Sequence, residues 1–391
     1  MTSDPIVIVG AARTPMGGFQ GSLKDVLAPQ LGTAAIKAAL ERAGVAPDQV
    51  DEVIMGCVLP AGQGQAPARQ ASLGAGIPDS IGATTINKMC GSGMKAAMLA
   101  HDLIAAGTNE VMVAGGMESM TNAPYLLEKA RGGYRLGHGR VMDHMFLDGL
   151  EDAYDKGRLM GTFAEDCAQA FQFTRQQQDE FAISSLTRAQ KAIKDGTFDR
   201  ETVPVALKSE QVTQDEQPLK ARLDKIPTLK PAFRADGTVT PANSSSISDG
   251  GAALVLMRRS QAEKRGLKPL AVIHGHTTHA ARPPDFPTAP IGAIRKLYDK
   301  TGWTKSDVDL WEINEAFAVV TMAAMRELDL PHDKVNVHGG ACALGHPIGA
   351  SGARILVTLM NALDKYGMKR GVASLCIGGG EATAIAIERV N

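Results

Sequence analysis

Short apolar runs alternate along most of this chain with longer stretches that carry apolar residues at helical spacing. The short runs predict buried strands, and the longer stretches predict helices that cover a sheet. The predicted strands lie at residues 6–9, 53–58, 111–114, 270–273, 310–313 and 372–377. The predicted helices lie at residues 29–43, 94–106, 291–300, 315–328 and 350–366. Strands that alternate with helices are typical of an α/β fold built in layers.

The two ends of the chain share a local order of elements, which indicates a weak internal duplication. A glycine turn, a helix, a glycine stop, an apolar strand and a pair of glycines occur at residues 92–116 and again at residues 351–379. Residues 121–248 differ, because they are rich in glycine, charge and glutamine, with a helix expected at 177–194 and an irregular stretch at 209–230. We interpret this region as an insertion over the site.

Length and composition indicate a globular protein of more than one domain. A chain of 391 residues is long for a single core, so two or three domains are expected. We divide it into an N-terminal domain at 1–268, with the inserted loop domain at about 121–248, and a C-terminal domain at 269–391. A formal net charge of -1 argues against a nucleic-acid partner, since such a surface needs a basic excess.

The cysteines and the apolar segments suggest a compartment. The chain has five cysteines, an odd number, and none forms a close-spaced pair, so a disulfide scaffold is not expected. A reducing cytoplasm fits this usage and keeps the thiols available. The first residues lack the basic start of a secretory signal, and no apolar run is long enough for a membrane span, so no membrane association is expected.

One cysteine lies where a glycine-rich turn leads into a helix. Cys90 belongs to the sequence Asn-Lys-Met-Cys-Gly-Ser-Gly at residues 87–93, directly before the predicted helix 94–106. The free N–H groups and the dipole at a helix N-terminus favour a thiolate, which is a nucleophile. Free cysteines are also among the most buried residues of proteins. This segment alone leaves a nucleophile and a structural cysteine equally open.

Three further polar positions occur at junctions between loops and regular elements. His346 lies at the apex of a glycine-rich turn at residues 339–352, and Cys376 ends an apolar strand before three glycines. Asn314 begins the predicted helix that follows strand 310–313. Each alone is explained as a satisfied histidine, a structural cysteine or a helix cap. Together with Cys90, such residues at loop junctions indicate a catalytic site.

These motifs identify the family that the chain resembles. They are Ala-Arg-Thr-Pro at 12–15, Pro-Ala-Arg-Gln at 67–70, Cys-Gly-Ser-Gly at 90–93, Gly-Gly-Met-Glu-Ser at 115–119, Asn-Glu-Ala-Phe-Ala at 314–318, Gly-His-Pro-Ile-Gly at 345–349 and Cys-Ile-Gly-Gly-Gly at 376–380. Over essentially its whole length the chain resembles the thiolases, and among them the acetyl-CoA C-acetyltransferases. The resemblance implies a five-layer αβαβα core of two similar halves, with a loop domain that covers coenzyme A.

The resemblance also implies a reaction, the reversible Claisen condensation of two acetyl-CoA to acetoacetyl-CoA and CoA. Cys90 would hold the acyl group, and His346 would take its proton. Cys376 would move a proton at the α-carbon of the second thioester, since a thiol can exchange protons near neutrality when its surroundings favour the thiolate. By analogy, Asn314 would hold a water beside His346, and the backbone N–H groups of Cys90 and Gly378 would stabilise the oxyanion.

Contacts to coenzyme A follow from the resemblance position by position. The residues expected to bind substrate are Ser245, Met160, Ala316, Phe317, Phe286 and Lys220, with Arg222 as an alternative to Lys220. Leu159 stands where acetoacetyl-CoA thiolases usually carry histidine, and Glu381 after the three glycines is also unusual. Coenzyme A thioesters are substrates here, and no other cofactor is expected, because no dinucleotide fingerprint or phosphate-binding loop is present.

Several alternatives remain at this stage. A broad-range 3-ketoacyl-CoA thiolase of fatty-acid breakdown shares the same motifs. Ketoacyl-carrier-protein synthases share the fold and the nucleophile but need no second cysteine, and a non-catalytic CoA-binding protein needs none of the catalytic residues. His274, His276 and His279 have a spacing that suits a metal, yet no carboxylate or cysteine lies near them in the sequence, so no metal is expected. The family also suggests a homotetramer of two dimers, joined by a loop at residues 125–141.

Overall fold

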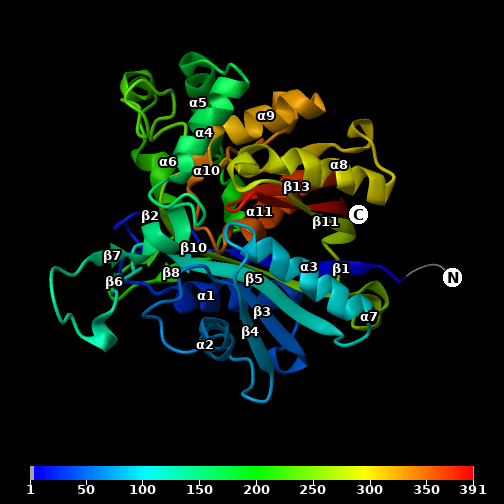
Figure 1. Ribbon diagram of the computed structural model, residues 1–391. Coiled ribbons are helices and arrows are strands. Elements are labelled where there is room, and N and C mark those ends of the chain that lie inside the picture. Colours follow the sequence, from blue (N-terminus) through cyan, green and yellow to red (C-terminus); the bar gives the residue numbers. More distant parts are fainter. Residues whose placement is uncertain (1–3, 391) are drawn as a thin grey trace.

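The computed structural model describes residues 4–390, and its centre is one mixed ten-stranded sheet. The strands run in the order β12-β13-β14-β11-β1-β10-β5-β3-β4, and β2 pairs with β10 (Figure 1). Their bounds are β1 Ile6–Arg13, β2 Gly17–Gly18, β3 Glu52–Gly56, β4 Gly82–Ile86, β5 Val111–Ser119, β10 Ser248–Arg258, β11 Ala271–Ala280, β12 Leu310–Ile313, β13 Arg370–Ile377 and β14 Glu381–Arg389. Neighbouring strands β3 and β5 are parallel, as are β12 and β13, so each end of the sheet has parallel pairing.

The sheet consists of two halves joined by a short contact. Between β1 and β11 only two residue pairs are in register, Val7 with Val272 and Ile8 with Ala271. One half contains strands β1 to β5 together with β10, and the other contains β11 to β14. In Figure 1 the two halves lie one above the other, with helices between them and on both outer faces.

The helices complete five layers. Helices α1 (Ala28–Ala43) and α2 (Pro67–Gly74) pack on the outer face of the first half. Helices α8 (Ala289–Thr301) and α9 (Ala318–Leu328) cover the outer face of the second half. Helices α3 (Ser92–Ala105) and α11 (Ser351–Lys365) lie between the halves and share one apolar cluster with both. The predicted five-layer αβαβα fold is therefore confirmed.

The two central helices touch at their first turns through glycine. A Cβ atom on Gly93 would lie 2.8 Å from the backbone nitrogen of Ala353, and a Cβ on Gly352 would overlap the backbone of Met94. No other residue type allows two helix backbones to approach so closely. These are the equivalent glycines of the duplicated pattern. Their contact brings the N-terminal ends of both helices to one place.

The remaining elements belong mainly to the segment between β5 and β10. Its helices and strands are β6 Tyr125–Leu127, β7 Val141–Asp143, α4 Met160–Ala170, α5 Arg175–Lys194, β8 Val205–Ala206, β9 Gln211–Val212 and α6 Glu216–Lys220. Two short helices lie outside it, α7 Arg259–Lys264 and α10 Ala341–Leu344. None of the helices within residues 4–390 has the length and apolar character needed to cross a bilayer.

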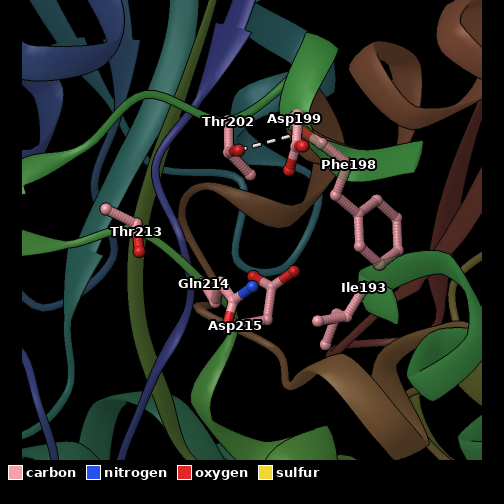
Figure 2. Close-up of a pocket in the computed structure, with 7 residues that line it drawn as sticks. All are labelled: Ile193, Phe198, Asp199, Thr202, Thr213, Gln214 and Asp215. Atoms are coloured by element: carbon pink, nitrogen blue, oxygen red, sulfur yellow. Dashed lines mark hydrogen bonds between the residues drawn. The ribbon is translucent and has the colours of Figure 1, made fainter. Parts of the chain in front are cut away.

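A buried ion-pair network ties this inserted segment to the sheet. The guanidinium of Arg13, at the end of β1, lies 2.6 Å from the Glu201 carboxylate and 2.7 Å from that of Asp215, and all three side chains are buried. The guanidinium also stacks over Phe198, 4.8 Å from the ring centroid. Figure 2 shows Asp215 and Phe198 on the wall of a cavity of about 10 Å³. None of the expected site residues lines that cavity.

One predicted helix begins later than expected, and three strands were not predicted. The helix expected from residue 315 begins at Ala318, because Phe317 is extended and forms a bridge with Ser244, while the Ala318 N–H donates to the Asn243 carbonyl. Strands β4, β10 and β14 were not identified from the sequence. In β10 every residue up to the last is buried, so it lacks the polar alternation that marks a strand with one face in water.

Candidate active site

The contact between α3 and α11 brings the predicted nucleophile and base to the same end of the molecule. Cys90 lies two residues before α3, and His346 lies five residues before α11. Cys90 packs against an apolar cluster that includes Ile348, from the turn that carries His346. The two halves of the duplicated pattern therefore each contribute one turn to a common site.

The Cys90 turn is held in a strained conformation. Met89, directly before Cys90, has φ of 46°, a left-handed conformation that is rare for a side chain of this size. Its N–H donates to Asn87 Oδ1 at 2.8 Å, and the Lys88 N–H donates to Ser92 Oγ at 2.8 Å. These side-chain acceptors compensate for the strain and hold the cysteine at the start of the helix.

Burial acts against the thiolate that the helix end is expected to favour at Cys90. The residue has some solvent exposure, but burial of its sulfur raises the pKa of the thiol to about 11. Hydrogen bonds from the backbone N–H groups of Gly378 and of Cys90 itself act in the opposite direction without outweighing burial. The sequence showed the helix end correctly, but it did not show how much of the second half covers the sulfur.

His346 is a buried, neutral imidazole with a defined tautomer. Its Nδ1 lies 2.5 Å from Ser351 Oγ, and that hydroxyl donates to the carbonyl of Pro347 at 3.0 Å. Since the hydroxyl proton is used there, Nδ1 carries the imidazole proton and Nε2 has the free lone pair. Burial, with a further contribution from Arg354, lowers the pKa of His346 to about 3. The ring is therefore neutral, with a lone pair on Nε2.

Asn314 and Cys376 join this group from the second half. The Asn314 amide lies 3.5 Å from His346 Nε2, and its backbone N–H donates to the carbonyl of Ser374, two residues before Cys376. Cys376 ends β13 and is buried. Burial raises the pKa of its thiol well above the usual value, and a negative charge on the neighbouring Cys90 would raise it further. The surroundings of Cys376 therefore favour the thiol.

A cluster of packed apolar side chains lies beside Cys376. One cluster contains Cys376 together with Phe286, Ala316 and Phe317, and Met160 packs against it. The Phe286 ring is 6.1 Å from that of Phe163 and 6.5 Å from that of Phe317. The structure thus brings together four of the expected substrate-binding residues.

Ser245 and Lys220 lie at a second, more polar part of the site. The Ser245 N–H donates to the carbonyl of Ala316 at 2.9 Å, and the next residue, Ser246, lines a cavity of about 370 Å³. Lys220 lines the same cavity and forms an ion pair with Glu216. Arg222 and Lys225 add two further cations to its wall, of which Lys225 was not expected from the sequence.

Glu118 is a site residue that the sequence did not assign. Its carboxylate accepts backbone hydrogen bonds from Val58 at 2.9 Å, Leu59 at 3.1 Å and Gly349 at 2.8 Å. Burial raises its pKa to about 7, against these hydrogen bonds, which lower it. It therefore ties the His346 turn to the first half. The only sign of this role in the sequence was the place of Glu118 in the motif at 115–119.

Two more residues hold the site and were unassigned. Ser351 sets the tautomer of His346, as described above, and its only sequence signal was its place in the duplicated Ser-Gly pair. Lys88 forms an ion pair with Glu381, the unusual residue after the three glycines. This pair links the Cys90 turn to the turn that carries Gly378. Glu381 therefore has a structural partner in this chain.

Comparison with known proteins gives a consistent result. Family models described as "Thiolase, N-terminal domain" and "Thiolase, C-terminal domain" match residues 6–260 and 267–389. The chain is 49% identical to "Acetyl-CoA acetyltransferase" of Cupriavidus necator, covering 98% of this chain and 99% of the relative. It is 50% identical to "Acetyl-CoA acetyltransferase, cytosolic" of Mus musculus, covering 99% of each.

Solved structures agree with these relatives. The acetyl-CoA acetyltransferase of Bacillus anthracis superposes with a TM-score of 0.95 at 43% identity, covering 99% of each chain. The Acat5 thiolase of Ascaris suum, solved in complex with coenzyme A, superposes with a TM-score of 0.94 at 41% identity. That match covers 99% of this chain and 100% of the other.

Proposed function

This chain belongs to the thiolase family, and we propose that it is an acetyl-CoA acetyltransferase, which reversibly condenses two acetyl-CoA to acetoacetyl-CoA and CoA. The observation that carries the proposal is the meeting of the Cys90, His346 and Cys376 segments at the common end of α3 and α11. The names of the relatives from Cupriavidus necator and Mus musculus support the same activity.

The first half-reaction acetylates Cys90. The sulfur attacks the thioester carbonyl while its proton moves to Nε2 of the neutral His346, because a separate thiolate is disfavoured by burial. The oxyanion that forms accepts hydrogen bonds from the N–H groups of Cys90 and Gly378, which already point at the sulfur. The C–S bond to CoA then breaks, and the Cys376 thiol gives its proton to the leaving sulfur.

The second half-reaction makes the carbon–carbon bond. Cys376 is now a thiolate and takes a proton from the α-carbon of the second acetyl-CoA, which becomes an enolate beside Asn314 and His346. The enolate attacks the acetyl group on Cys90, and the Cys90 sulfur leaves with the proton held by His346. Both thiols are then protonated again, which is the state that burial favours.

The cavity that Lys220 lines suits the nucleotide end of coenzyme A. Lys220, Arg222 and Lys225 supply positive charge on its wall, and phosphate groups carry the complementary charge. Ser245 lies between this cavity and the acyl pocket and contacts Ala316 through its backbone. We assign Ser245 to the pantetheine arm and the three cations to the phosphates. The chain needs no further cofactor for this reaction.

The assembly that we propose is a homotetramer of two dimers. The hairpin of β6 and β7 extends away from the body of the molecule (Figure 1). It carries exposed apolar side chains, with Leu136 at 97% exposure and Tyr125 at 68%. A contact with another copy would cover this surface. The five unpaired cysteines support a reducing cytoplasm as the compartment.

The experiment that tests the function is intact-mass measurement after mixing with acetyl-CoA. Cys376→Ala should still take up an acetyl group, more slowly than the unchanged protein, yet fail to form acetoacetyl-CoA. Cys90→Ala should fail at both, because no covalent intermediate is possible. Cys167→Ala serves as the control, since Cys167 is buried in the neighbouring apolar cluster and has no assigned role in the reaction. An adduct on Cys90→Ala but not on Cys376→Ala would reverse the two roles.

A further inference from the structure

A second group of ionisable side chains lies at the other end of α3. His101 and Asp102 belong to the last turns of that helix, and His276 belongs to β11 in the second half. Within residues 4–390 they form the one set of three or more histidine, cysteine or acidic residues with metal-ligand spacing. The set lies outside the catalytic group, which is at the N-terminal end of α3.

The three ligand atoms form a compact triangle. His276 Nε2 lies 2.8 Å from Asp102 Oδ1 and 3.3 Å from His101 Nδ1, and His101 Nδ1 lies 3.0 Å from Asp102 Oδ1. Zinc–ligand bonds of about 2.0–2.1 Å in a tetrahedral site separate the ligand atoms by about 3.3 Å. The nitrogen–nitrogen distance already matches, and the two distances to oxygen need to lengthen only by a few tenths of an ångström.

The ligand types suit a cation. Two imidazoles and one carboxylate are the ligands that zinc and its neighbours in the transition series prefer.

A β-bulge explains why the sequence did not indicate this site. The register of β11 shifts between Ile273 and Gly275, so His274 and His276 do not share a face. His274 contacts Trp303 on the outer side, whereas His276 contacts α3 in the central layer. Two carboxylates that are distant in the sequence lie near these histidines in the fold, Asp102 beside His276 and Glu388 beside His274.

We propose that His101, Asp102 and His276 bind one divalent transition-metal ion of the zinc class, which joins α3 of the first half to β11 of the second. His276 is buried and Asp102 is half exposed, so the ion would have protein on one side and solvent ligands on the other. The nearest cation is Lys300, which donates to the backbone carbonyl of His276 and leaves the side chain free to coordinate. This inference does not depend on the proposed enzymatic activity.

Zinc binding to the purified full chain tests the proposal. The protein is treated with chelator, its accessible thiols are blocked with iodoacetamide, and Zn²⁺ is titrated by calorimetry. One ion should bind, and His276→Ala and Asp102→Asn should each weaken this binding by at least about tenfold. His279→Ala, on the same strand outside the triangle, should bind as the unchanged protein does. The midpoint of thermal unfolding should rise with Zn²⁺ in the proteins that bind it.

The outcomes separate the site from adventitious binding. If the unchanged protein and the three variants bind zinc with equal affinity, zinc binds elsewhere. If the unchanged protein binds no zinc below millimolar Zn²⁺, the triangle is only a hydrogen-bond network. Either result overturns the proposal. Retained thiolysis of acetoacetyl-CoA by His276→Ala and Asp102→Asn shows that these variants are folded. If either variant does not fold, His101→Ala is used in its place.

Discussion

At the scale of single residues, the protonation and orientation of each reacting group depend on hydrogen bonds with its neighbours. The Ser351 hydroxyl oxygen accepts a hydrogen bond from the Nδ1–H group of His346, so the lone pair of Nε2 stays free to act as a base. The backbone N–H groups of Cys90 and Gly378 donate to the Cys90 sulfur, next to the place where the carbonyl oxygen of a bound thioester would become the oxyanion. The catalytic side chains therefore need the surrounding hydrogen bonds in order to have the right protonation and orientation.

Ser351→Ala should lower kcat by about tenfold or more with little change in KM. Without the hydroxyl, the buried Nδ1–H has no acceptor, which costs about 1–3 kcal/mol and allows the other tautomer. Steady-state thiolysis of acetoacetyl-CoA measures both constants. Ser351→Thr keeps the hydroxyl and should recover much of the rate. Ser306→Ala, at an exposed turn, is the control. Equal kcat for Ser351→Ala and the unchanged protein would show that the tautomer is set in another way.

At the scale of elements, two contacts shape the site, one between helices and one between aromatic rings. The first turns of α3 and α11 touch through Gly93 and Gly352. Phe286, from the short 3-10 helix Pro283–Thr288, packs on Phe163 of α4 in the apolar cluster beside Cys376. The first contact brings the proposed reacting groups together, and we propose that the second limits the size of the acyl chain.

Gly352→Ala should destabilise the fold and slow the reaction. The added methyl group would overlap the backbone of Met94, and overpacking of a tight core contact costs about 1–3 kcal/mol. Urea unfolding, followed by circular dichroism, gives the change in free energy, and single-turnover acetylation gives the rate. Gly132→Ala is a matched control, since a Cβ there meets no atom within 4 Å. If both variants unfold at the same urea concentration, the helices tolerate a wider separation.

Phe286 should restrict the enzyme to short acyl chains. A buried aromatic ring against Phe163 and Phe317 leaves little room beyond acetoacetyl-CoA. We expect faster thiolysis of acetoacetyl-CoA than of 3-ketooctanoyl-CoA, and a smaller difference for Phe286→Ala. Phe171→Ala, at the rim of the same cluster, is the control. Equal or faster cleavage of the longer substrate by the unchanged protein would support the alternative, a broad-range 3-ketoacyl-CoA thiolase.

At the scale of the whole molecule, the fold consists of two similar halves that share a central layer of helices. The halves are joined by a two-pair contact between β1 and β11 and by the apolar cluster around α3 and α11. The inserted segment is anchored at Arg13, and it meets the second half at the apolar cluster beside Cys376 and at the cavity that Lys220 lines. The residues expected to bind substrate thus come from both the inserted segment and the second half.

The chain should assemble as a tetramer through the hairpin of β6 and β7. Light scattering at micromolar concentration should give the mass of four chains. Leu136→Glu places a charge on the exposed apolar tip and should leave dimers, whereas Tyr366→Glu, elsewhere on the surface, should not. A stable monomer of the unchanged protein is the result that contradicts this assembly.

The sequence by itself determined the family, the layered α/β fold, the duplicated halves and the residues proposed for the site. It did so because glycine turns, helical periodicity and the cysteine, histidine and asparagine motifs are local patterns. The positions of Cys90, His346 and Cys376 could be predicted for this reason. Strand β10 was missed because a strand buried on both faces lacks alternation.

Only the tertiary structure decided the charge states and the long-range partners. The pKa of Cys90 depends on how the second half covers its sulfur, and desolvation there outweighs the helix end that the sequence shows. Asp102 meets His276 only because the β-bulge in β11 turns that histidine toward α3. Burial and contacts between distant segments come from packing of the two halves, and no local pattern of residues contains them.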